Sequence, residues 1–358
     1  MKILFFIRDF EGGPAKNLSL LSNRLYKKHD VLIIQIQQKP LAFDNDLNEH
    51  IKRVILNKKK ISIFSIIKIF KIIFQFNPDI IHSFDFLSNV MSFLILIFYR
   101  KIIFVTSVRG LETGFNGWRR HVQSLIFRRA QKIHCVSNAV REKIYSYFPA
   151  VKDKVQFIRN GIDVNKFQFK KINNIDKDLL IIGCISNYYD EVKGQTFLLK
   201  ALEILSHEND INFLAYFIGD GPLKKKCEIL SNKLNLKSKV FFNGFKKDIR
   251  SELKKINVLV LPSLSESFGL ILLEAAASGV FIMGSKVGGI PEIIKEGETG
   301  YLFKAGDSNE IAEKIKYLIN DANNNQIIKN AYTNVLKNYN IYEITKEFEN
   351  MYASSLKR

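Results

Sequence analysis

Two carboxylates flank a glycine-marked turn in the stretch 257–300. Glu266 and Glu274 have seven residues between them, and Gly269 is one of those seven. If a helix begins here, its first amides lack intrahelical partners and favour an anion, and Gly269 lets a ligand approach the backbone. A carboxylate, an anion cradle and a second carboxylate could hold the sugar, diphosphate and ribose of a nucleotide sugar. An ordinary buried helix with a capping glutamate explains the pattern equally well.

The spacing of the two carboxylates separates one kind of chemistry from another. Helical rise over eight residues predicts a separation of roughly 12 Å, with both side chains on the same side. A glycosidase needs its carboxylates roughly 5 to 9.5 Å apart, so this spacing suits two groups that hold opposite ends of one long ligand. The amides predicted to face the anion belong to Ser267, Phe268, Gly269 and Leu270.

The elements around this turn place it at the edge of a sheet. Residues 257–261 form an apolar run ended by Pro262, which is typical of a buried parallel strand. The residues after Gly269 are apolar on most sides of a helix, which predicts burial, and Gly279 is placed to end that helix. Ligand sites in open α/β sheets lie where the strands end.

Together these residues resemble a known family. The Glu266 to Glu274 pattern, the turn at 288–292 (GGIPE) and the glycines Gly297 and Gly300 resemble the donor site of the retaining family 4 glycosyltransferases. The resemblance covers nearly the whole chain and is weaker towards the N-terminus. It implies the GT-B fold, two Rossmann-like doubly wound domains that face a central cleft. It also implies that no metal is needed and that a nucleotide sugar, UDP-linked more than GDP-linked, is the co-substrate, with no cofactor.

The resemblance also carries roles over to individual residues. It implies that Glu274 binds the ribose, Glu266 holds the sugar and Lys193 neutralises the leaving diphosphate together with the amides of 268–270. Two glycines after the first strand would approach the diphosphate and the acceptor, and a turn in the second half would hold the base. These residues are Gly12, Gly13, Gly244 and Phe245.

Three further positions bear on the acceptor and the phosphates. His82 ends an expected strand; a lone histidine is more often structural, but the family often has histidine here, which favours contact with the acceptor. Arg109 stands where many relatives carry an active-site histidine, and it could hold a phosphate or a sugar hydroxyl. Asn187 stands where relatives usually have arginine. Whether Arg109 or Arg8 replaces that charge stays open.

Apolar runs and helical stretches alternate along the whole chain, which predicts doubly wound parallel sheets. We expect an acceptor-binding domain at 1–165, a polar linker at 166–178, a nucleotide-sugar domain at 179–335 and a C-terminal helix, 336–358, that returns to the first domain. Strands are expected at 2–7, 31–36, 79–83, 101–107, 132–136 and 154–158, and then at 179–185, 211–218, 239–243, 257–261 and 280–283.

Composition excludes several other classes. The chain has 358 residues, of which 47% are hydrophobic and 25% are charged, as in globular proteins. Its three cysteines are too few for a disulfide framework and indicate reduced thiols in the cytosol. The first apolar run, 3–7, is too short for a signal peptide. The longest, 86–99, is too short to span a bilayer, so we expect a buried helix there.

Positive charge is concentrated in the first half. Residues 1–165 carry 27 Lys and Arg against 12 Asp and Glu, a net +15, while the remainder carries 27 against 23, a net +4. This asymmetry favours an anionic partner for the first domain, either nucleic acid or an anionic membrane face. Residues 58–76 mix Ile, Phe and Lys at helical spacing. They indicate either an interfacial helix or a core-packing helix with solvated lysines.

The sequence therefore predicts a metal-independent, retaining hexosyltransferase that moves a sugar from a nucleotide sugar to a glycan or lipid-linked acceptor. Surface polysaccharide or lipopolysaccharide synthesis is the expected setting, at the cytoplasmic face of the cell membrane and in peripheral contact with it, without nucleic acid. Two alternatives remain. A nucleotide-sugar 2-epimerase of the same fold would turn over its donor without an acceptor, and a basic nucleic-acid-binding protein would bind in a salt-dependent way without affinity for nucleotide sugars.

Overall fold

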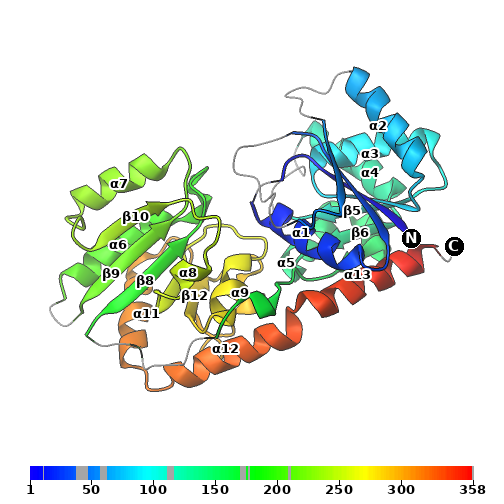
Figure 1. Ribbon diagram of the computed structural model, residues 1–358. Coiled ribbons are helices and arrows are strands. Elements are labelled where there is room, and N and C mark those ends of the chain that lie inside the picture. Colours follow the sequence, from blue (N-terminus) through cyan, green and yellow to red (C-terminus); the bar gives the residue numbers. More distant parts are fainter. Residues whose placement is uncertain are drawn as a thin grey trace. The chain divides into compact units, whose positions relative to one another are not determined.

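The chain folds into two compact α/β units in the computed structural model (Figure 1). The first unit comprises Met1–Ile162 and Ile341–Arg358, and the second comprises Asp163–Asn340. The structure describes residues 1–10, 12–37, 47–56, 63–110, 117–169, 175, 178–208 and 211–356. Each unit has one parallel sheet, so the predicted pair of Rossmann-like domains is confirmed. The first segment ends three residues before the expected boundary at 165.

The first unit is built on a seven-stranded parallel sheet with the order β3-β2-β1-β4-β5-β6-β7. The sequence predicted six of these strands and missed β3, which lies at the edge of the sheet, begins with two charged residues and is only partly buried. The strands are β1 (Lys2–Ile7), β2 (Asp30–Gln35), β3 (Lys52–Ile55), β4 (Ile80–Ser83), β5 (Ile103–Val108), β6 (Lys132–Cys135) and β7 (Val155–Phe157).

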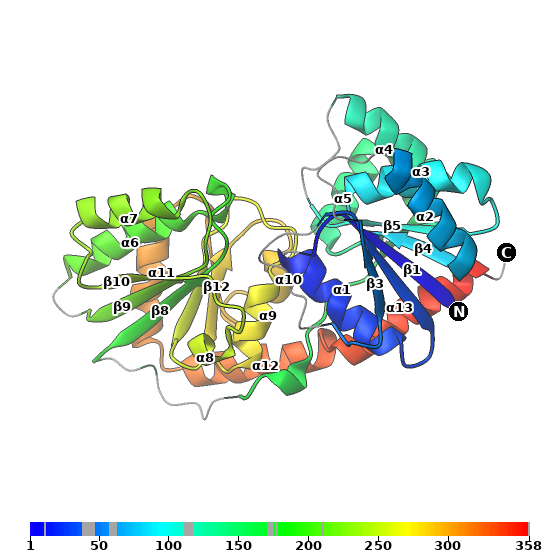
Figure 2. The same cartoon turned by 45° about the horizontal axis from the view of Figure 1, so that its top comes forward.

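Helices cover both faces of this first sheet, as right-handed crossovers require when the strand order reverses at β1. Figure 2 shows α1 and α13 on one side of the sheet and α2, α3 and α4 on the other. The helices are α1 (Gly12–Leu25), α2 (Ile63–Phe76), α3 (Phe86–Phe98), α4 (Trp118–Arg129), α5 (Asn138–Tyr147) and α13 (Ile341–Leu356), with 3-10 turns η2 (Pro149–Lys154) and η3 (Val164–Lys166), of which η3 belongs to the second unit.

The last helix, α13, completes the core of the first unit. The first residue of this helix is held by a hydrogen bond that Ile341 N donates to Ile162 O at 3.0 Å. A Cβ atom on Gly161 would lie only 3.0 Å from Cα of Ile341, so glycine permits this close approach. Phe348 and Tyr352 then pack into the same core as β1 and α1. The predicted segment 336–358 is thus divided: the returning helix begins at 341, and the residues before it belong to the second unit, where α12 ends at Asn338.

The second unit has a six-stranded parallel sheet with the order β10-β9-β8-β11-β12-β13. The short edge strand β13 was not predicted, because three residues are too few to show a period. The strands are β8 (Leu180–Ile185), β9 (Phe213–Ile218), β10 (Val240–Gly244), β11 (Val258–Leu261), β12 (Phe281–Ser285) and β13 (Tyr301–Phe303).

Helices also cover both faces of the second sheet. On one face α11 packs against α6, which packs against α7, and elsewhere α12 packs against α9. The helices are η4 (Glu191–Lys193), α6 (Gln195–Ser206), α7 (Lys224–Lys233), α8 (Arg250–Leu253), α9 (Leu270–Ala277), α10 (Ile290–Ile293), α11 (Ser308–Asn320) and α12 (Asn324–Asn338).

Some predictions fall outside the described residues, namely the start of the helix expected at 58–76 and most of the linker at 166–178. Within the described parts of the chain, no helix is long and apolar enough to cross a membrane. The expected helix at 86–99 exists as α3, but it is not fully buried, since Leu94, Ile97 and Phe98 are exposed.

Candidate functional site

Lys193 and Glu266 meet at the C-terminal edge of the second sheet. Lys193 ends the turn η4 after β8, and Glu266 lies in the loop after the neighbouring strand β11. The Lys193 Nζ atom donates to Glu266 Oε2 at 2.8 Å, and the side chains are 24% and 15% exposed. The two residues that the sequence assigned to the diphosphate and to the sugar therefore form one ion pair that solvent still reaches.

A backbone contact and a glycine hold these two loops together. Leu264 N donates to Val192 O at 2.7 Å. Gly194 has φ +67°, and a Cβ atom there would lie 1.9 Å from the carbonyl oxygen of Pro262. Only glycine fits this contact, which fixes the residue after Lys193 against the start of the loop that carries Glu266.

A third loop supports the Glu266 loop from the side of β12. Gly289 N donates to Glu266 O at 3.0 Å. A Cβ atom on Gly289 would lie 2.5 Å from Ser267 O and 2.9 Å from Cα of Phe268. The GGIPE turn of the resemblance therefore acts as a backbone support for residues 266–268.

The start of α9 carries the predicted anion cradle. The helix begins at Leu270, and its N-cap is Gly269, which has φ +97° and gives no side-chain cap. Among the described residues, no hydrogen-bond partner is found for the backbone amides of Ser267, Phe268, Gly269 and Leu270. Unpaired amides at a helix start attract an anion, and the cation of Lys193 comes from the adjoining loop.

The predicted geometry of the two carboxylates needs a correction. The estimate of 12 Å assumed helical rise from Glu266 to Glu274, but α9 begins only at Leu270, so Glu266 lies in a loop. Glu274 lies inside the helix and is 3% exposed. A bound ribose would have to reach it through that small remaining surface.

The turn after β10 lies beside a cation that sequence reasoning missed. Gly244 ends β10 with φ +65°, and its oxygen accepts a hydrogen bond from Gly219 N at 2.9 Å. A Cβ atom on Gly244 would lie 3.8 Å from Nζ of Lys224, which is near the start of α7. Phe245 follows with 37% of its surface exposed. No sequence signal distinguished Lys224 from other surface lysines.

Gln195 is a second residue that no sequence pattern distinguished. Its side chain is 4% exposed, and Nε2 donates to Asn187 O at 2.7 Å and to Ser186 Oγ at 2.9 Å. Gln195 thereby fixes the loop after β8 at the position where relatives usually carry arginine.

In the first unit, Arg109 follows β5 and is surrounded by neutral groups. Its guanidinium donates to Asn17 Oδ1 at 3.1 Å and to Asn160 Oδ1 at 3.4 Å, and Cζ lies 4.4 Å from the centre of the Phe84 ring. Among the residues that the structure describes, none is a hydrogen-bond partner of the buried Nε atom of Arg109 or of Nδ2 of Asn17. Burial lowers the pKa of Arg109 to about 9, which leaves it charged at neutral pH. Asn17 lies on α1, whose first residues are Gly12 and Gly13.

His82 is placed where it cannot touch an acceptor. It is 0% exposed, its Nδ1 lies 2.7 Å from Tyr352 Oη, and its Nε2 lies 2.7 Å from Ser107 Oγ. Ser107 Oγ in turn lies 2.7 Å from Nδ1 of His134, whose Nε2 lies 2.9 Å from Ile158 O. Both ring nitrogens of His82 are used, so the geometry favours the structural alternative, and we give His82 no contact with substrate.

This buried chain of hydrogen bonds has one consistent direction. Ile158 O can only accept, so His134 donates from Nε2 and accepts at Nδ1 from the Ser107 hydroxyl. Ser107 then accepts from Nε2 of His82, which accepts at Nδ1 from Tyr352. Burial lowers the pKa of His82 and lowers that of His134 to about 3, with the Arg109 charge adding to both effects. Both rings are therefore neutral.

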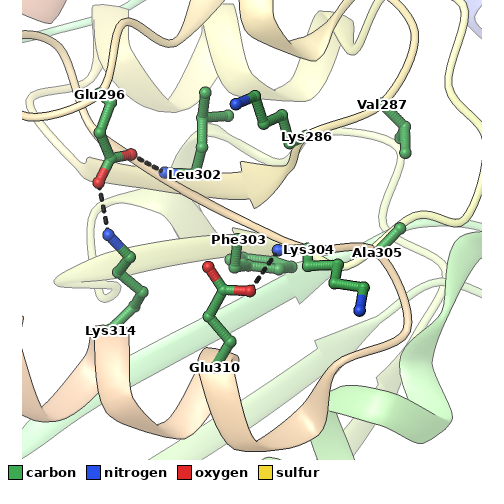
Figure 3. A pocket seen from close by; sticks show the side chains of 9 residues that line it. All are labelled: Lys286, Val287, Glu296, Leu302, Phe303, Lys304, Ala305, Glu310 and Lys314. Carbon is green, nitrogen blue, oxygen red and sulfur yellow. Dashed lines mark hydrogen bonds and ion pairs between the residues drawn. The ribbon is translucent and has the colours of Figure 1, made fainter.

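A separate cavity of about 550 Å³ lies beside the edge strand β13 (Figure 3). Its carboxylates are already engaged: Glu296 accepts from the Leu302 amide and pairs with Lys314, and Glu310 accepts from the Lys304 amide. None of the residues predicted from the sequence lines this cavity.

Comparison with solved structures identifies the fold. HepE from Anabaena, solved in complex with UDP and glucose, superposes with a TM-score of 0.85 at 21% identity, covering 99% of this chain and 100% of that chain. The fold is therefore that of the GT-B glycosyltransferases. Two family models then match consecutive parts of the chain: "Glycosyltransferase Family 4" at residues 12–166 and "Glycosyl transferases group 1" at residues 165–334. The chain belongs to this family of glycosyltransferases.

Relatives with assigned names act on different molecules. The N-acetyl-alpha-D-glucosaminyl L-malate synthase of Bacillus anthracis is 29% identical over 269 residues, which are 72% of this chain and 69% of the relative. The capsular polysaccharide biosynthesis glycosyltransferase CapM of Staphylococcus aureus is 28% identical over 367 residues, 92% of this chain and 91% of the relative. The chain is thus a glycosyltransferase related to enzymes of capsule synthesis.

Proposed function

We propose that this protein transfers a sugar from a nucleotide sugar, with UDP favoured over GDP, to a glycan or lipid-linked acceptor of a surface polysaccharide or lipopolysaccharide. The observation that carries this proposal is the Lys193–Glu266 ion pair beside the unpartnered amides at the start of α9. HepE, solved with UDP and glucose, supports the choice of UDP, and CapM supports a capsular product.

Each donor part has a proposed partner in the second unit. The diphosphate binds Lys193 and the amides of Phe268 and Gly269, because a cation and a helix start both stabilise the negative charge that develops as the phosphate leaves. The sugar hydroxyls bind Glu266, and the ribose hydroxyls donate to Glu274. The base lies against Gly244 and Phe245.

The transfer step needs no protein base in this account. The bond between the anomeric carbon and the phosphate oxygen breaks, and the acceptor oxygen bonds to the same face of that carbon. Because the new bond forms on the face that the phosphate leaves, the sugar keeps its configuration. The acceptor hydroxyl gives its proton to the leaving phosphate oxygen, so charge balances. We propose that the reaction is independent of metal, because Lys193 and the amides supply the positive charge to the diphosphate.

The first unit contributes the acceptor side of the proposal. Arg109 carries a charge that no carboxylate neutralises in the part of the chain that the structure describes, and its Nε donor is unused. We propose that it binds a phosphate or a sugar hydroxyl. We also propose that the glycines at the start of α1, Gly12 and Gly13, let the acceptor approach the backbone there.

A thermal-stabilisation screen tests the donor. The protein is melted with UDP, GDP and ADP and with their common sugar conjugates, and a ligand that binds only the folded state raises the melting temperature. We expect one nucleotide to stabilise the protein selectively. Stabilisation by none of them would contradict the proposal.

Product analysis tests the reaction. With the selected donor, we expect nucleotide release that depends on an added glycan or lipid-linked acceptor, and NMR of the product should show the donor's anomeric configuration. Conversion of the donor to its 2-epimer without an acceptor would instead show an epimerase.

A further inference from the structure

The first unit presents large apolar side chains to solvent on three neighbouring helices. Phe64 and Phe74 on α2 are 77% and 75% exposed, Phe98 on α3 is 74% exposed, and Trp118 on α4 is 66% exposed. Aliphatic side chains lie between them on the same helices and are also exposed, namely Ile67, Leu94, Ile97 and Leu125. Such residues scattered singly need no explanation, but a group of this size on adjoining helices marks an interaction site.

Helix α2 shows the pattern most clearly. At about 100° per residue, its exposed side chains fall within an arc of about 120°. That arc contains Phe64, Ile67 and Phe74 together with Lys68 and Lys71, while Ile69 and Ile73 on the opposite side are buried. The exposed face therefore carries apolar side chains as well as lysines, which favours the interfacial alternative over a core-packing helix with solvated lysines.

Ring contacts join the three helices into one surface. Phe70 of α2 packs edge-on against Phe98 of α3 at 5.5 Å between ring centres. Phe86 of α3 packs against Trp118 of α4 at 5.9 Å, and the Arg119 guanidinium lies 5.5 Å from the Phe86 ring. Figures 1 and 2 show α2, α3 and α4 as neighbours on one face of the first sheet. We call this the α2-α3-α4 surface.

The charge of the α2-α3-α4 surface has a single sign. None of the three helices contains Asp or Glu. Exposed basic residues accompany the apolar ones: Lys68, Lys71, Arg100, Lys101, Arg119, Arg120 and Arg128.

The charge of this surface decides between possible partners. The α2-α3-α4 surfaces of two copies of this chain would repel each other, because both are positively charged. Nucleic acid is contacted mainly through its phosphates and sugars, which a surface with this many exposed isoleucine, leucine and phenylalanine side chains matches poorly. An anionic lipid bilayer matches both the charge and the apolar side chains.

We propose that the α2-α3-α4 surface docks this protein on an anionic lipid bilayer. Phe64, Phe74, Phe98 and Trp118 enter the boundary between headgroups and acyl chains, and Lys68, Lys71 and the neighbouring arginines contact lipid phosphates. The helices lie on the bilayer, since α3, at 13 residues, is about 20 Å long and a span needs about 30 Å. The proposal does not depend on which sugar is transferred, because docking is measured without donor or acceptor.

Vesicle flotation of the full chain tests the docking. The probes are vesicles of phosphatidylcholine alone and of phosphatidylcholine with phosphatidylglycerol in equal parts. We expect flotation with the anionic vesicles and a blue shift in the emission of Trp118, the single tryptophan of the chain. Absence of flotation with anionic vesicles would overturn the proposal, and so would flotation without a shift of Trp118 emission.

Two paired variants separate insertion from charge. Phe64→Ser with Phe74→Ser should lower partitioning to anionic vesicles at least tenfold, since each phenyl ring contributes burial. Lys68→Gln with Lys71→Gln should lower the preference for anionic over neutral vesicles, by about tenfold or more at low salt. The matched control changes exposed residues of α7 in the second unit, Ile229→Ser with Lys233→Gln, and should bind as the wild type does.

Further outcomes would contradict the lipid assignment. The wild type should stay monomeric in sedimentation and should bind no single-stranded DNA or RNA. Self-association or nucleic-acid binding that the Phe64→Ser and Phe74→Ser pair abolishes would assign the surface to that partner instead. Thermal stability of each variant is measured alongside, so that loss of folding is not mistaken for loss of docking.

Discussion

The Nζ atom of Lys193 lies 2.8 Å from Oε2 of Glu266, so the two side chains assigned to the diphosphate and to the sugar form an ion pair with each other. A bound diphosphate would compete with Glu266 for the same cation. The contact with the Glu266 carboxylate keeps the Lys193 side chain oriented. Because of the competition, Glu266 should weaken the binding of the diphosphate while it strengthens the binding of the sugar.

Charge variants of this pair should behave in opposite ways. Lys193→Ala should weaken UDP binding about 10- to 100-fold, as for the loss of a hydrogen bond to a charged group, and should leave uridine binding unchanged. Glu266→Gln should bind UDP as tightly as the wild type or more tightly, and should lower transfer. Calorimetry measures the binding, with Lys233→Ala on the surface of α7 as control. Equal weakening of UDP and uridine by Lys193→Ala would contradict the phosphate role.

Glycine at position 194 should be indispensable to the loop. Gly194→Ala places Cβ 1.9 Å from Pro262 O in addition to the left-handed φ, whereas Gly297→Ala has φ +70° and nothing within 4 Å. The control Gly297→Ala should lower the free energy of unfolding by about 1 to 2 kcal/mol, and Gly194→Ala should lower it by more. Urea unfolding measures both. Equal costs would show that the loop yields without strain.

The sequence could predict much of the fold because the buried strands are continuous apolar runs between turn residues. It also predicted the helix after Gly269 and its end near Gly279, because glycine marks both positions. It missed the edge strands β3 and β13, because β3 is only partly buried and begins with two charged residues, and β13 has only three residues.

The candidate site was predictable only in part. The resemblance to the family selected Lys193 and Glu266, but no sequence pattern shows that two loops 73 residues apart place them in contact. The supporting roles of Gln195 and Gly289 arise from contacts between loops, which sequence spacing does not contain. His82 could not be separated from a substrate contact until its two partners were seen.

The buried histidines predict that acid destabilises the first unit. Folding lowers the pKa of His82 and His134 below the value of 6.5 expected when unfolded. The unfolded chain thus binds more protons below that pH, and stability is present above pH 6.5 and falls as the pH falls. For His134 this loss should be about 2 kcal/mol at pH 5 relative to neutral pH, and His82 shifts the stability in the same direction.

Urea unfolding at pH 7 and pH 5 measures this loss. His134→Gln should reduce the dependence on pH, while His121→Gln, at an exposed position of α4, should not. A stability that does not change between the two pH values would show that the histidines are not held neutral.

Arg109 should bind a ligand in addition to stabilising the fold. Arg109→Lys keeps the charge but loses the planar fork whose two terminal nitrogens donate to Asn160 and Asn17. We expect the acceptor KM to rise about tenfold, as for a lost charged hydrogen bond, with donor affinity nearly unchanged. Weaker donor binding instead would show that Arg109 supplies the missing phosphate charge. Arg8→Lys, whose Nε pairs with Asp9, is the comparison variant.

Glu274 gives the most direct test that the second unit binds a nucleotide sugar. Calorimetric titration of the nucleotide selected by the stabilisation screen is made with the wild type, Glu274→Gln, Glu274→Ala and the control Glu313→Gln, at an exposed position of α11. Glu274→Gln removes the carboxylate that accepts hydrogen bonds from two ribose hydroxyls, so it should weaken nucleotide binding at least tenfold, and Glu274→Ala should weaken it further. The control should match the wild type. Undiminished affinity in a folded Glu274→Ala protein would contradict the donor site and, with it, the proposed function.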